Sequence, residues 1–541
     1  MRRRTGIAAF VTAVAASALA ATAVGPGAQA SVANPGNDTH LIPGDLLVST
    51  SYYTNDPNIV AGQTILPPGS GSAGKTAIAG GDYPYVFNND TVDGSFGVTS
   101  KLDLLEITPR GLPQGLIRVP DSDLVTSFSS KSEGALNLSS DGKYLSFIDY
   151  AAAPDTVDVS NANTRGVIDP TNPVSAAYYR AVATLTQNGK WTFTETNAYS
   201  GNNGRAAVMA KIDGKYYIYT AGNAGNGANP QPSGVVLGAG AQIMTPSGLP
   251  ESAQAPGQPT PVGSFNITQL GDKADKVGKD DNFRGLALYN NVLYYTKGSG
   301  GNGVDTIYFL DTTGTACPHG TGVPVAGAPL PTTDIAASLT SAGLSSNLCI
   351  LKGFPTALAK SATDASGYPF GLWFANPTTL YVADEGAGDN AYSATSNTYT
   401  AAAASTTAGL QKWVYNSSAG EWRLAYTLQN GLNLGTPYTV LGYPTGTNSV
   451  TGLPWAPATG GLRNITGQVN RDGTVTIWGV TSTVSGSGDQ GADPNRLVRV
   501  TDTLGATSLP AAERFFTVVP ALYDQVVRGV SFTPGPDHGE S

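Results

Sequence analysis

The chain has 541 residues, of which 67 are glycine and 36 are proline, and only 13% are charged. Its hydrophobic share of 40% is enough for a large core, which excludes wholesale disorder. So much glycine and proline argues against a helical protein, because both residues favour turns and loops. The glycines also lack the every-third spacing of collagen.

The N-terminus has the features of a secretory signal peptide. Arg2–Arg4 form a basic start, Ile7–Val24 is apolar and rich in alanine, and Ala28–Ala30 fits the small-residue cleavage rule. We therefore assign residues 1–30 to a signal peptide and 31–541 to a secreted domain. A retained membrane anchor is the alternative. No later segment has the roughly 18 apolar residues of a spanning helix, so no membrane span is expected.

The net charge of the chain limits the classes of partner that it can bind, and its two cysteines predict a disulfide. Removing the signal peptide takes away three of the 30 basic residues and leaves a net charge of −12. Such a chain is a poor general binder of nucleic acid or anionic membranes. We also expect a monomer. Cys317 and Cys349 predict one disulfide in an exported protein, with two separate thiols as the alternative.

A unit of four strands recurs along the chain. Each copy has an apolar strand, a tight turn, an alternating strand, a longer loop, and two further strands joined by another tight turn. The clearest copy covers 134–148, with a turn at Asp141-Gly142, and 179–194, with a turn at Asn188-Gly189. Asp-Gly and Asn-Gly between alternating segments are strong hairpin signals. Further copies begin near residues 205, 284, 370 and 463.

The two ends of the domain complement each other. Segment 527–532 has the pattern of an innermost strand that no partner strands follow. Segments 45–51 and 101–107 begin a unit that lacks its innermost strand. One C-terminal strand joined to three N-terminal strands would close a ring and remove an exposed edge. We predict an all-β fold, a single β-propeller of six four-stranded blades over residues 40–535. A seventh blade in 312–366 and a pair of β-sandwiches are the alternatives.

This architecture resembles the β-propeller superfamily. The segments Tyr381–Gly386 and Thr296–Gly301 look like parts of secreted bacterial propeller proteins. The resemblance does not reach a particular family and brings no catalytic residue with it.

The long connections are predicted on one face. In a propeller blade, the turns between strands one and two and between three and four share one face, and all other connections share the opposite face. The long stretches here are assigned to this second class: 52–100, 149–177, 221–234, 297–304, 384–409, 481–495, 312–366 and 429–462. Long loops commonly carry function, so we expect the site on this long-loop face, over the central channel.

Four of the six innermost strands begin with arginine. The four are Arg205, Arg284, Arg463 and Arg528. If the blades align, these side chains gather at the mouth of the channel, where guanidinium groups suit carboxylate, sulfate or phosphate. The pattern therefore predicts an anion-binding ring. The alternative is structural, with each arginine paired to groups of adjacent blades.

Carboxyl groups are predicted on the same face. Glu133 begins an innermost strand, Asp149 ends a second strand, and Asp384 and Glu385 end another. Together they are candidate catalytic acids and bases beside a substrate held by arginine.

The cofactor most compatible with these loops is Ca²⁺. Asp384, Asp389 and Asn390 supply the hard oxygen ligands that Ca²⁺ prefers, although their spacing is not that of an EF-hand and a solvated loop is the alternative. No nucleotide cofactor is expected. Residues 69–76 match a P-loop letter for letter but lack the flanking strand and helix that hold phosphate.

These observations predict a secreted propeller that binds an anionic small molecule or polysaccharide at an arginine-lined channel mouth. If it is an enzyme, we expect a hydrolase or lyase acting on an acidic glycan or a phosphoester. An arginine cluster on a propeller is reminiscent of sialidases, by analogy only. The competing hypothesis is a non-catalytic extracellular binding protein.

Overall fold

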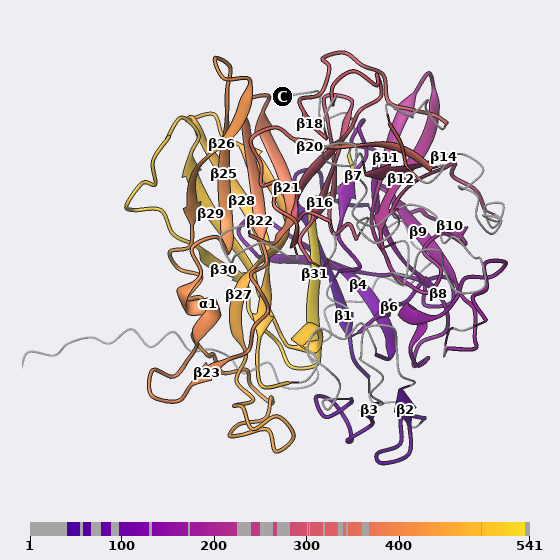
Figure 1. Cartoon of the computed structure of the whole chain (residues 1–541). Coiled ribbons are helices and arrows are strands. Elements are labelled where there is room, and N and C mark those ends of the chain that lie inside the picture. Colours follow the sequence, from indigo (N-terminus) through magenta and orange to yellow (C-terminus); the bar gives the residue numbers. More distant parts are fainter. Residues whose placement is uncertain are drawn as a thin grey trace, which may run out of the picture.

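The computed structural model shows a β-propeller that is almost free of helix (Figure 1). It describes residues 40–535 apart from 55–57, 67–76, 88–96, 129–131, 171, 173, 224–239, 249–262, 268–281, 300, 302, 318–319, 334–338, 342–343, 360–366 and 488–489. The predicted signal peptide and the P-loop-like segment lie outside the described residues.

Six blades, each with four principal antiparallel strands, form the ring, as predicted. The strands are given from the channel outward. Blade 1 contains β7 (Asn137–Leu138), β8 (Tyr144–Ala151), β9 (Tyr179–Thr186) and β10 (Trp191–Thr196). Blade 2 contains β11 (Gly204–Ile212), β12 (Lys215–Gly222), β13 (Ala241–Met244) and β14 (Gly263–Ile267). Blade 3 contains β15 (Leu286–Tyr289), β16 (Val292–Lys297), β17 (Thr306–Leu310) and β20 (Leu344–Leu351).

The remaining blades complete the circle. Blade 4 contains β21 (Pro369–Asn376), β22 (Thr379–Asp384), β25 (Gly409–Asn416) and β26 (Glu421–Leu428). Blade 5 contains β27 (Ala458–Val469), β28 (Thr474–Val484), β29 (Leu497–Thr503) and β30 (Phe516–Val519). Blade 6 contains β31 (Gln525–Phe532), β1 (Leu46–Tyr52), β4 (Thr99–Ile107) and β5 (Pro113–Arg118).

Blade 6 joins the two ends of the chain, which confirms the predicted closure. β31 pairs antiparallel with β1, from Leu46 opposite Phe532 to Tyr52 opposite Gln525. Each innermost strand contacts the innermost strand of the next blade, and β31 contacts β7, so the ring has no open side.

Glycines allow the innermost strands to approach backbone to backbone. A Cβ atom on Gly285 would lie 2.1 Å from the carbonyl oxygen of Phe370, and one on Gly371 would lie 2.5 Å from that of Arg463. No side chain fits in these gaps. Glycine is thus required at Gly285 and Gly371, where the innermost strands of blades 3, 4 and 5 meet.

The tight turns are of the predicted kind. Asp213 and Gly214 between β11 and β12 have φ values of 47° and 81°, and Asn290 and Asn291 between β15 and β16 have 48° and 58°. Positive φ at both central residues matches the twist of a hairpin, and Asn, Asp and Gly tolerate it best.

The stretch 312–366 is not a seventh blade, and the assignment of its part before β20 to the long-loop face was wrong, whereas the part after β20 connects blades 3 and 4 as predicted. β20 pairs with β17 and completes blade 3, while β18 (Thr321–Gly322) and β19 (Leu339–Ser341) pair with β20. The insertion between β17 and β20 is therefore a connection between strands three and four, which belongs to the opposite face. In Figure 1, β18 lies near the top, whereas β2 and β3 (Ile65–Leu66 and Ala77–Ile78) and β23 (Tyr392–Ser393), from strand two-to-three connections, lie at the bottom.

The remaining short elements belong to the connections between the principal strands. They are β6 (Thr126–Ser127), β24 (Thr398–Tyr399), α1 (Thr400–Ala404) and the 3₁₀ turns Val159–Asn161 and Gln490–Ala492. Over the part of the chain that the structure describes, no helix has the length and apolar character needed to cross a membrane.

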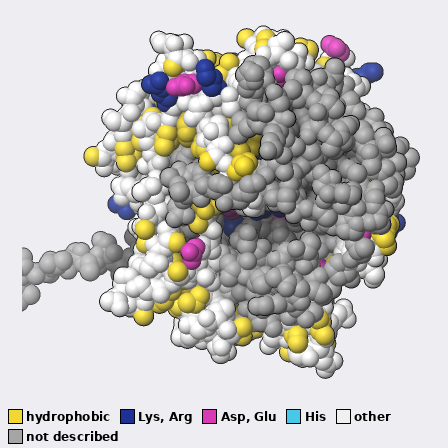
Figure 2. Space-filling view, in the orientation of Figure 1, with side chains coloured by type: hydrophobic (Ala, Val, Ile, Leu, Met, Phe, Trp, Pro, Cys, Tyr) yellow, Lys and Arg dark blue, Asp and Glu magenta, His cyan; other side chains and the backbone are white. Residues whose placement is uncertain are grey.

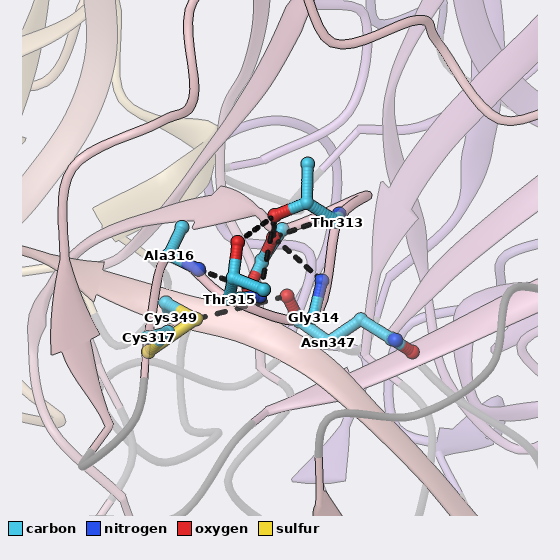
Figure 3. The surroundings of a disulfide bond; sticks show 8 residues. Thr313, Gly314, Thr315, Ala316, Cys317, Asn347 and Cys349 are labelled. Carbon is cyan, nitrogen blue, oxygen red and sulfur yellow. Dashed lines mark hydrogen bonds between the residues drawn. A yellow bond between two sulfur atoms is a disulfide. The ribbon is translucent and has the colours of Figure 1, made fainter.

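The predicted disulfide forms and ties the insertion to blade 3 (Figure 3). Cys317 and Cys349 are 32 residues apart, with their Cα atoms at 5.9 Å. The nearby turn is held by Asp311, whose carboxylate accepts hydrogen bonds from the backbone of Thr313 and Ala316 at 2.9 and 3.0 Å. In the chain-entropy description, closing such a loop stabilises the fold by about 3–4 kcal/mol.

Candidate functional site

The four predicted arginines lie at equivalent places on the ring. Arg205, Arg463 and Arg528 belong to β11, β27 and β31, and Arg284 lies two residues before β15. All four are buried. Arg205 and Arg284 lie at the start of their strands, whereas Arg463 and Arg528 lie further inside β27 and β31. We call the region around these four arginines the channel mouth.

Arg284 connects two parts of the ring that are not adjacent. Its Nη1 donates to the hydroxyl of Ser132, which precedes blade 1, and its Nη2 donates to the hydroxyl of Ser299 in blade 3. Its Nε is buried and has no hydrogen-bond partner among the described residues. Arg284 is thus bonded to neutral hydroxyl groups and not directly to a carboxylate.

Two other arginines mainly hold backbone and amide groups. Arg205 donates to Asn282 Oδ1 and, at 2.9 Å, to the carbonyl of Phe283. Arg528 donates to Ser51 Oγ at 3.0 Å and to the carbonyl of Phe128. These contacts favour the structural alternative for Arg205 and Arg528.

The fourth arginine joins blades 4 and 5 through an ion pair. Arg463 Nε donates to Glu385 Oε2 at 3.3 Å, and the two side chains are 5% and 11% exposed. The backbone of Glu385 is fixed separately, since its carbonyl accepts a 2.6 Å hydrogen bond from Ser482 Oγ.

Two of the predicted acids are enclosed. Glu133 accepts hydrogen bonds from Tyr150 OH and, at 2.8 Å, from Asn203 Nδ2. Asp149 is buried with both carboxyl oxygens lacking a hydrogen-bond partner in the described chain. Burial, and then the charge of Glu133, raise the pKa of Asp149 well above its usual value. The enclosed side chain of Asp149 has little access to a ligand.

Asp384 is also directed inward. Its carboxylate accepts hydrogen bonds from the backbone N–H groups of Tyr368 and Gly386 at 2.8 and 2.9 Å, and from Gln411 Nε2 at 3.0 Å. Burial raises its pKa to about 6, and the two backbone hydrogen bonds oppose that shift. Asp384 therefore orders the loop after β22.

Two of the candidate calcium ligands accept hydrogen bonds within their own loops. Asp384 uses both oxygens as described above, while Asp389 is exposed and accepts a 2.8 Å hydrogen bond from the backbone of Ala391. Within the described residues, no three His, Cys, Asp or Glu side chains are placed to hold a metal ion. The calcium site formed by Asp384, Asp389 and Asn390 stays a prediction.

The structure adds two residues that were not predicted, Lys297 and Asp305. Lys297 is fully buried and donates from Nζ to Asp305 Oδ1 at 2.7 Å. Burial raises the pKa of Asp305; Lys297 and Arg284 oppose the shift, and Glu385 adds to it. Asp305 is therefore close to both Arg284 and Glu385. Lys297 ends strand two and Asp305 precedes strand three, so their positions beside loop 297–304 were available as a signal.

A third unpredicted residue, Arg180, lies at the start of strand three in blade 1. Its guanidinium donates to the carbonyls of Asn202 and Ala162 at 3.0 and 2.8 Å. Burial lowers its pKa to about 10. These carbonyl contacts indicate that Arg180 stabilises the loops and does not face a ligand.

The cations and carboxyl groups assigned to the channel mouth are largely buried. Among the described residues they are the cations Arg205, Arg284, Lys297, Arg463 and Arg528 and the carboxyl groups of Glu133, Asp149, Asp305, Asp384 and Glu385. By contrast, Figure 2 shows only a few scattered charged side chains on the described surface of the face in view.

Comparisons with known proteins give no family. No protein-family model matches the chain, and no curated protein matches it. Three solved structures show a distant likeness. An endo-1,4-β-xylanase from Bacteroides thetaiotaomicron shares 10% identity over 73% of this chain and 99% of its own, with a TM-score of 0.28. An ulvan lyase, a polysaccharide lyase, shares 11% over 79% and 88%, with a TM-score of 0.29.

The third is an ancestral GH74 enzyme with 12% identity over 86% of this chain and 63% of its own, and a TM-score of 0.23. Likeness at this level carries no argument about function. The functional argument therefore comes from the side chains of the channel mouth.

Proposed function

We propose that this protein is secreted and binds an acidic polysaccharide at the channel mouth. The observation that carries the proposal is the state of Arg284. Its guanidinium is bonded to two serine hydroxyls, and one of these, Ser299, is half-buried at the surface. Anionic oxygens form stronger hydrogen bonds to guanidinium than neutral hydroxyls do, so a carboxylate or sulfate can take their place.

The charges around Arg284 favour a singly charged group. Lys297 is already paired with Asp305, and Arg463 with Glu385, which leaves Arg284 as the cation without a direct carboxylate partner among these three. The two carboxylates would repel a phosphate dianion. A uronic acid or sulfate ester within an otherwise neutral chain fits this balance better.

Binding to defined polymers tests the proposal. Polygalacturonate and dextran sulfate serve as anionic probes, with neutral dextran for comparison, in titrations of the full mature chain at low salt. We expect Arg284→Ala to weaken binding of at least one anionic polymer by about tenfold or more, as expected for losing a charge-assisted hydrogen bond. Salt should weaken the wild-type interaction, because it screens partly exposed charges.

The control variant removes a cation elsewhere. Arg423 is exposed on β26 and pairs with Glu421 at 3.1 Å, so Arg423→Ala makes the same change in net charge far from the inner strands. Arg284→Lys keeps the charge and should bind between wild type and alanine. Equal affinity of Arg284→Ala and Arg423→Ala for every anionic polymer would show that the channel mouth is not the binding site.

A further inference from the structure

We infer that Asp305 and Glu385 form a catalytic carboxyl pair that hydrolyses a glycosidic bond in the bound polysaccharide. The inference rests on the proposed function and adds a reaction to it. The pair spans adjacent blades, because Asp305 precedes β17 of blade 3 and Glu385 follows β22 of blade 4.

One oxygen of Asp305 is fixed and the other is available. Oδ1 accepts the 2.7 Å hydrogen bond from buried Lys297, whereas Oδ2 has no hydrogen bond to any residue that the structure describes. The side chain is 9% exposed. It is therefore held in one orientation while a small part of it stays exposed.

Glu385 has the complementary arrangement. Arg463 holds Oε2, while Oε1 has no hydrogen bond within the described chain, and the side chain is 11% exposed. The backbone N–H of Glu385 donates to the carbonyl of Tyr368 at 3.0 Å, and a Cβ atom on Gly298, the neighbour of Lys297, would lie 2.9 Å from the carbon of that carbonyl. The loop that carries Glu385 therefore packs beside the end of β16, where Lys297 holds Asp305.

The surroundings of Asp305 favour retention of a proton. Burial is the main cause of its raised pKa, and the nearby charge of Glu385 adds to it. Lys297 from β16 and Arg284 act in the opposite direction without cancelling the shift. A carboxyl pair in which one member holds a proton and the other is ionised is the arrangement used by glycosidases.

The proposed reaction is an ordinary hydrolysis of the glycosidic bond, in which every proton is accounted for. Asp305 gives its proton to the glycosidic oxygen as the bond from that oxygen to the sugar's anomeric carbon breaks. Water attacks the anomeric carbon and gives one proton to Glu385. The products are two sugar hydroxyl groups, and proton exchange with solvent restores the pair. Arg284 would hold the acidic group of a neighbouring sugar.

The other carboxyl groups at the channel mouth are less suited. Glu133 and Asp149 are enclosed, and both oxygens of Asp384 accept hydrogen bonds from the loops around it. Among the described carboxyl groups of the channel mouth, only Asp305 and Glu385 combine one hydrogen-bonded oxygen, one oxygen without a hydrogen bond to a described residue, and some exposure.

The test begins with polysaccharides that the wild-type protein binds. We expect new reducing ends from at least one of polygalacturonate, alginate, hyaluronan and carrageenan. Asp305→Asn should lose about 100-fold or more in rate on the polymer, a typical contribution of a general acid, while binding is kept. It should lose less than about tenfold on a 2,4-dinitrophenyl glycoside of the product sugar, whose leaving group needs no proton. Glu385→Gln should lose activity on both substrates.

Asp384→Asn is the matched control, since it changes a buried carboxyl group on the same face and should alter both rates equally. Binding without new reducing ends from any of the four polymers would overturn the inference and leave the proposed function standing. Products with a sugar double bond would indicate elimination and would also overturn it. Absence of binding would remove the proposed function itself.

Discussion

At the residue scale, the carboxyl groups of this protein differ mainly in what their oxygens contact. A second charged cluster, between blades 4 and 5, shows this clearly. Lys412 and Asp502 are fully buried and form an ion pair at 3.0 Å. The hydroxyls of Tyr381 and Tyr426 donate to the same carboxylate. Glu513 lies beside it, with Oε1 accepting a 2.8 Å hydrogen bond from the backbone of Thr503.

The two carboxyl groups of this cluster have pKa shifts of opposite sign. Burial, and then the hydrogen bond and charge of Asp502, raise the pKa of Glu513 to about 7. Burial opposes ionisation of Asp502 as well, but hydrogen bonds from Glu513 and the two tyrosines lower its pKa overall. Glu513 is therefore the member that holds the proton in the folded protein.

This assignment predicts a pH dependence of stability. Glutamate in the unfolded chain loses its proton near pH 4.5, whereas folded Glu513 keeps it until about pH 7. The free energy of unfolding should therefore fall as pH rises through this window. Glu513→Gln should flatten the fall, as measured by urea unfolding from pH 5 to 7.5. Glu421→Gln, on the exposed outer strand β26, should leave it unchanged. An equal slope in wild type and Glu513→Gln would contradict the assignment.

The sequence located charged positions but not their partners. Arg205, Arg284, Arg463 and Arg528 could be predicted because strand starts repeat along the chain. The hydrogen bond from Arg284 to Ser132 could not, because it joins residues 152 apart across the ring. Asp305 was missed for a related reason, since its importance comes from neighbours in two blades, Lys297 and Arg284 in blade 3 and Glu385 in blade 4.

At the element scale, most hairpins could be predicted from their tight turns, whereas a strand that follows a long insertion could not be assigned to its blade. Asp-Gly and Asn-Asn turns mark their hairpins locally. β20 follows an insertion of more than 30 residues after β17, and no local pattern shows that it completes the same blade. Its position depends on pairing with β17 and on the disulfide through Cys349.

The spacing of innermost strands gives a second prediction. Gly285→Ala places a Cβ atom 2.1 Å from the carbonyl oxygen of Phe370, so blades 3 and 4 must move apart. We expect a loss of about 1–3 kcal/mol in the free energy of unfolding, the usual cost of overpacking. Gly505→Ala is the control, because its Cβ atom would meet nothing within 4 Å. Equal stability of both variants would mean that the innermost strands are not in close backbone contact.

At the scale of the whole molecule, stability depends on closing the ring. Val48 of β1 lies opposite Val530 of β31, and both belong to one buried apolar cluster between blades 5 and 6. These two strands come from opposite ends of the described chain. Opening this pair would expose two strand edges and separate blade 6 from its own innermost strand.

A disulfide across the closure tests this dependence. Val48→Cys with Val530→Cys links positions separated by most of the chain, whereas Thr476→Cys with Thr501→Cys links adjacent strands of blade 5 that are 25 residues apart. In the chain-entropy description the first link should stabilise by roughly 5 kcal/mol or more and the second by about 3–4 kcal/mol. The measurement is chemical unfolding of each oxidised protein against its single-cysteine variant. A smaller gain from the closure link than from the link within blade 5 would mean that the ring does not open at β1 and β31 when the protein unfolds.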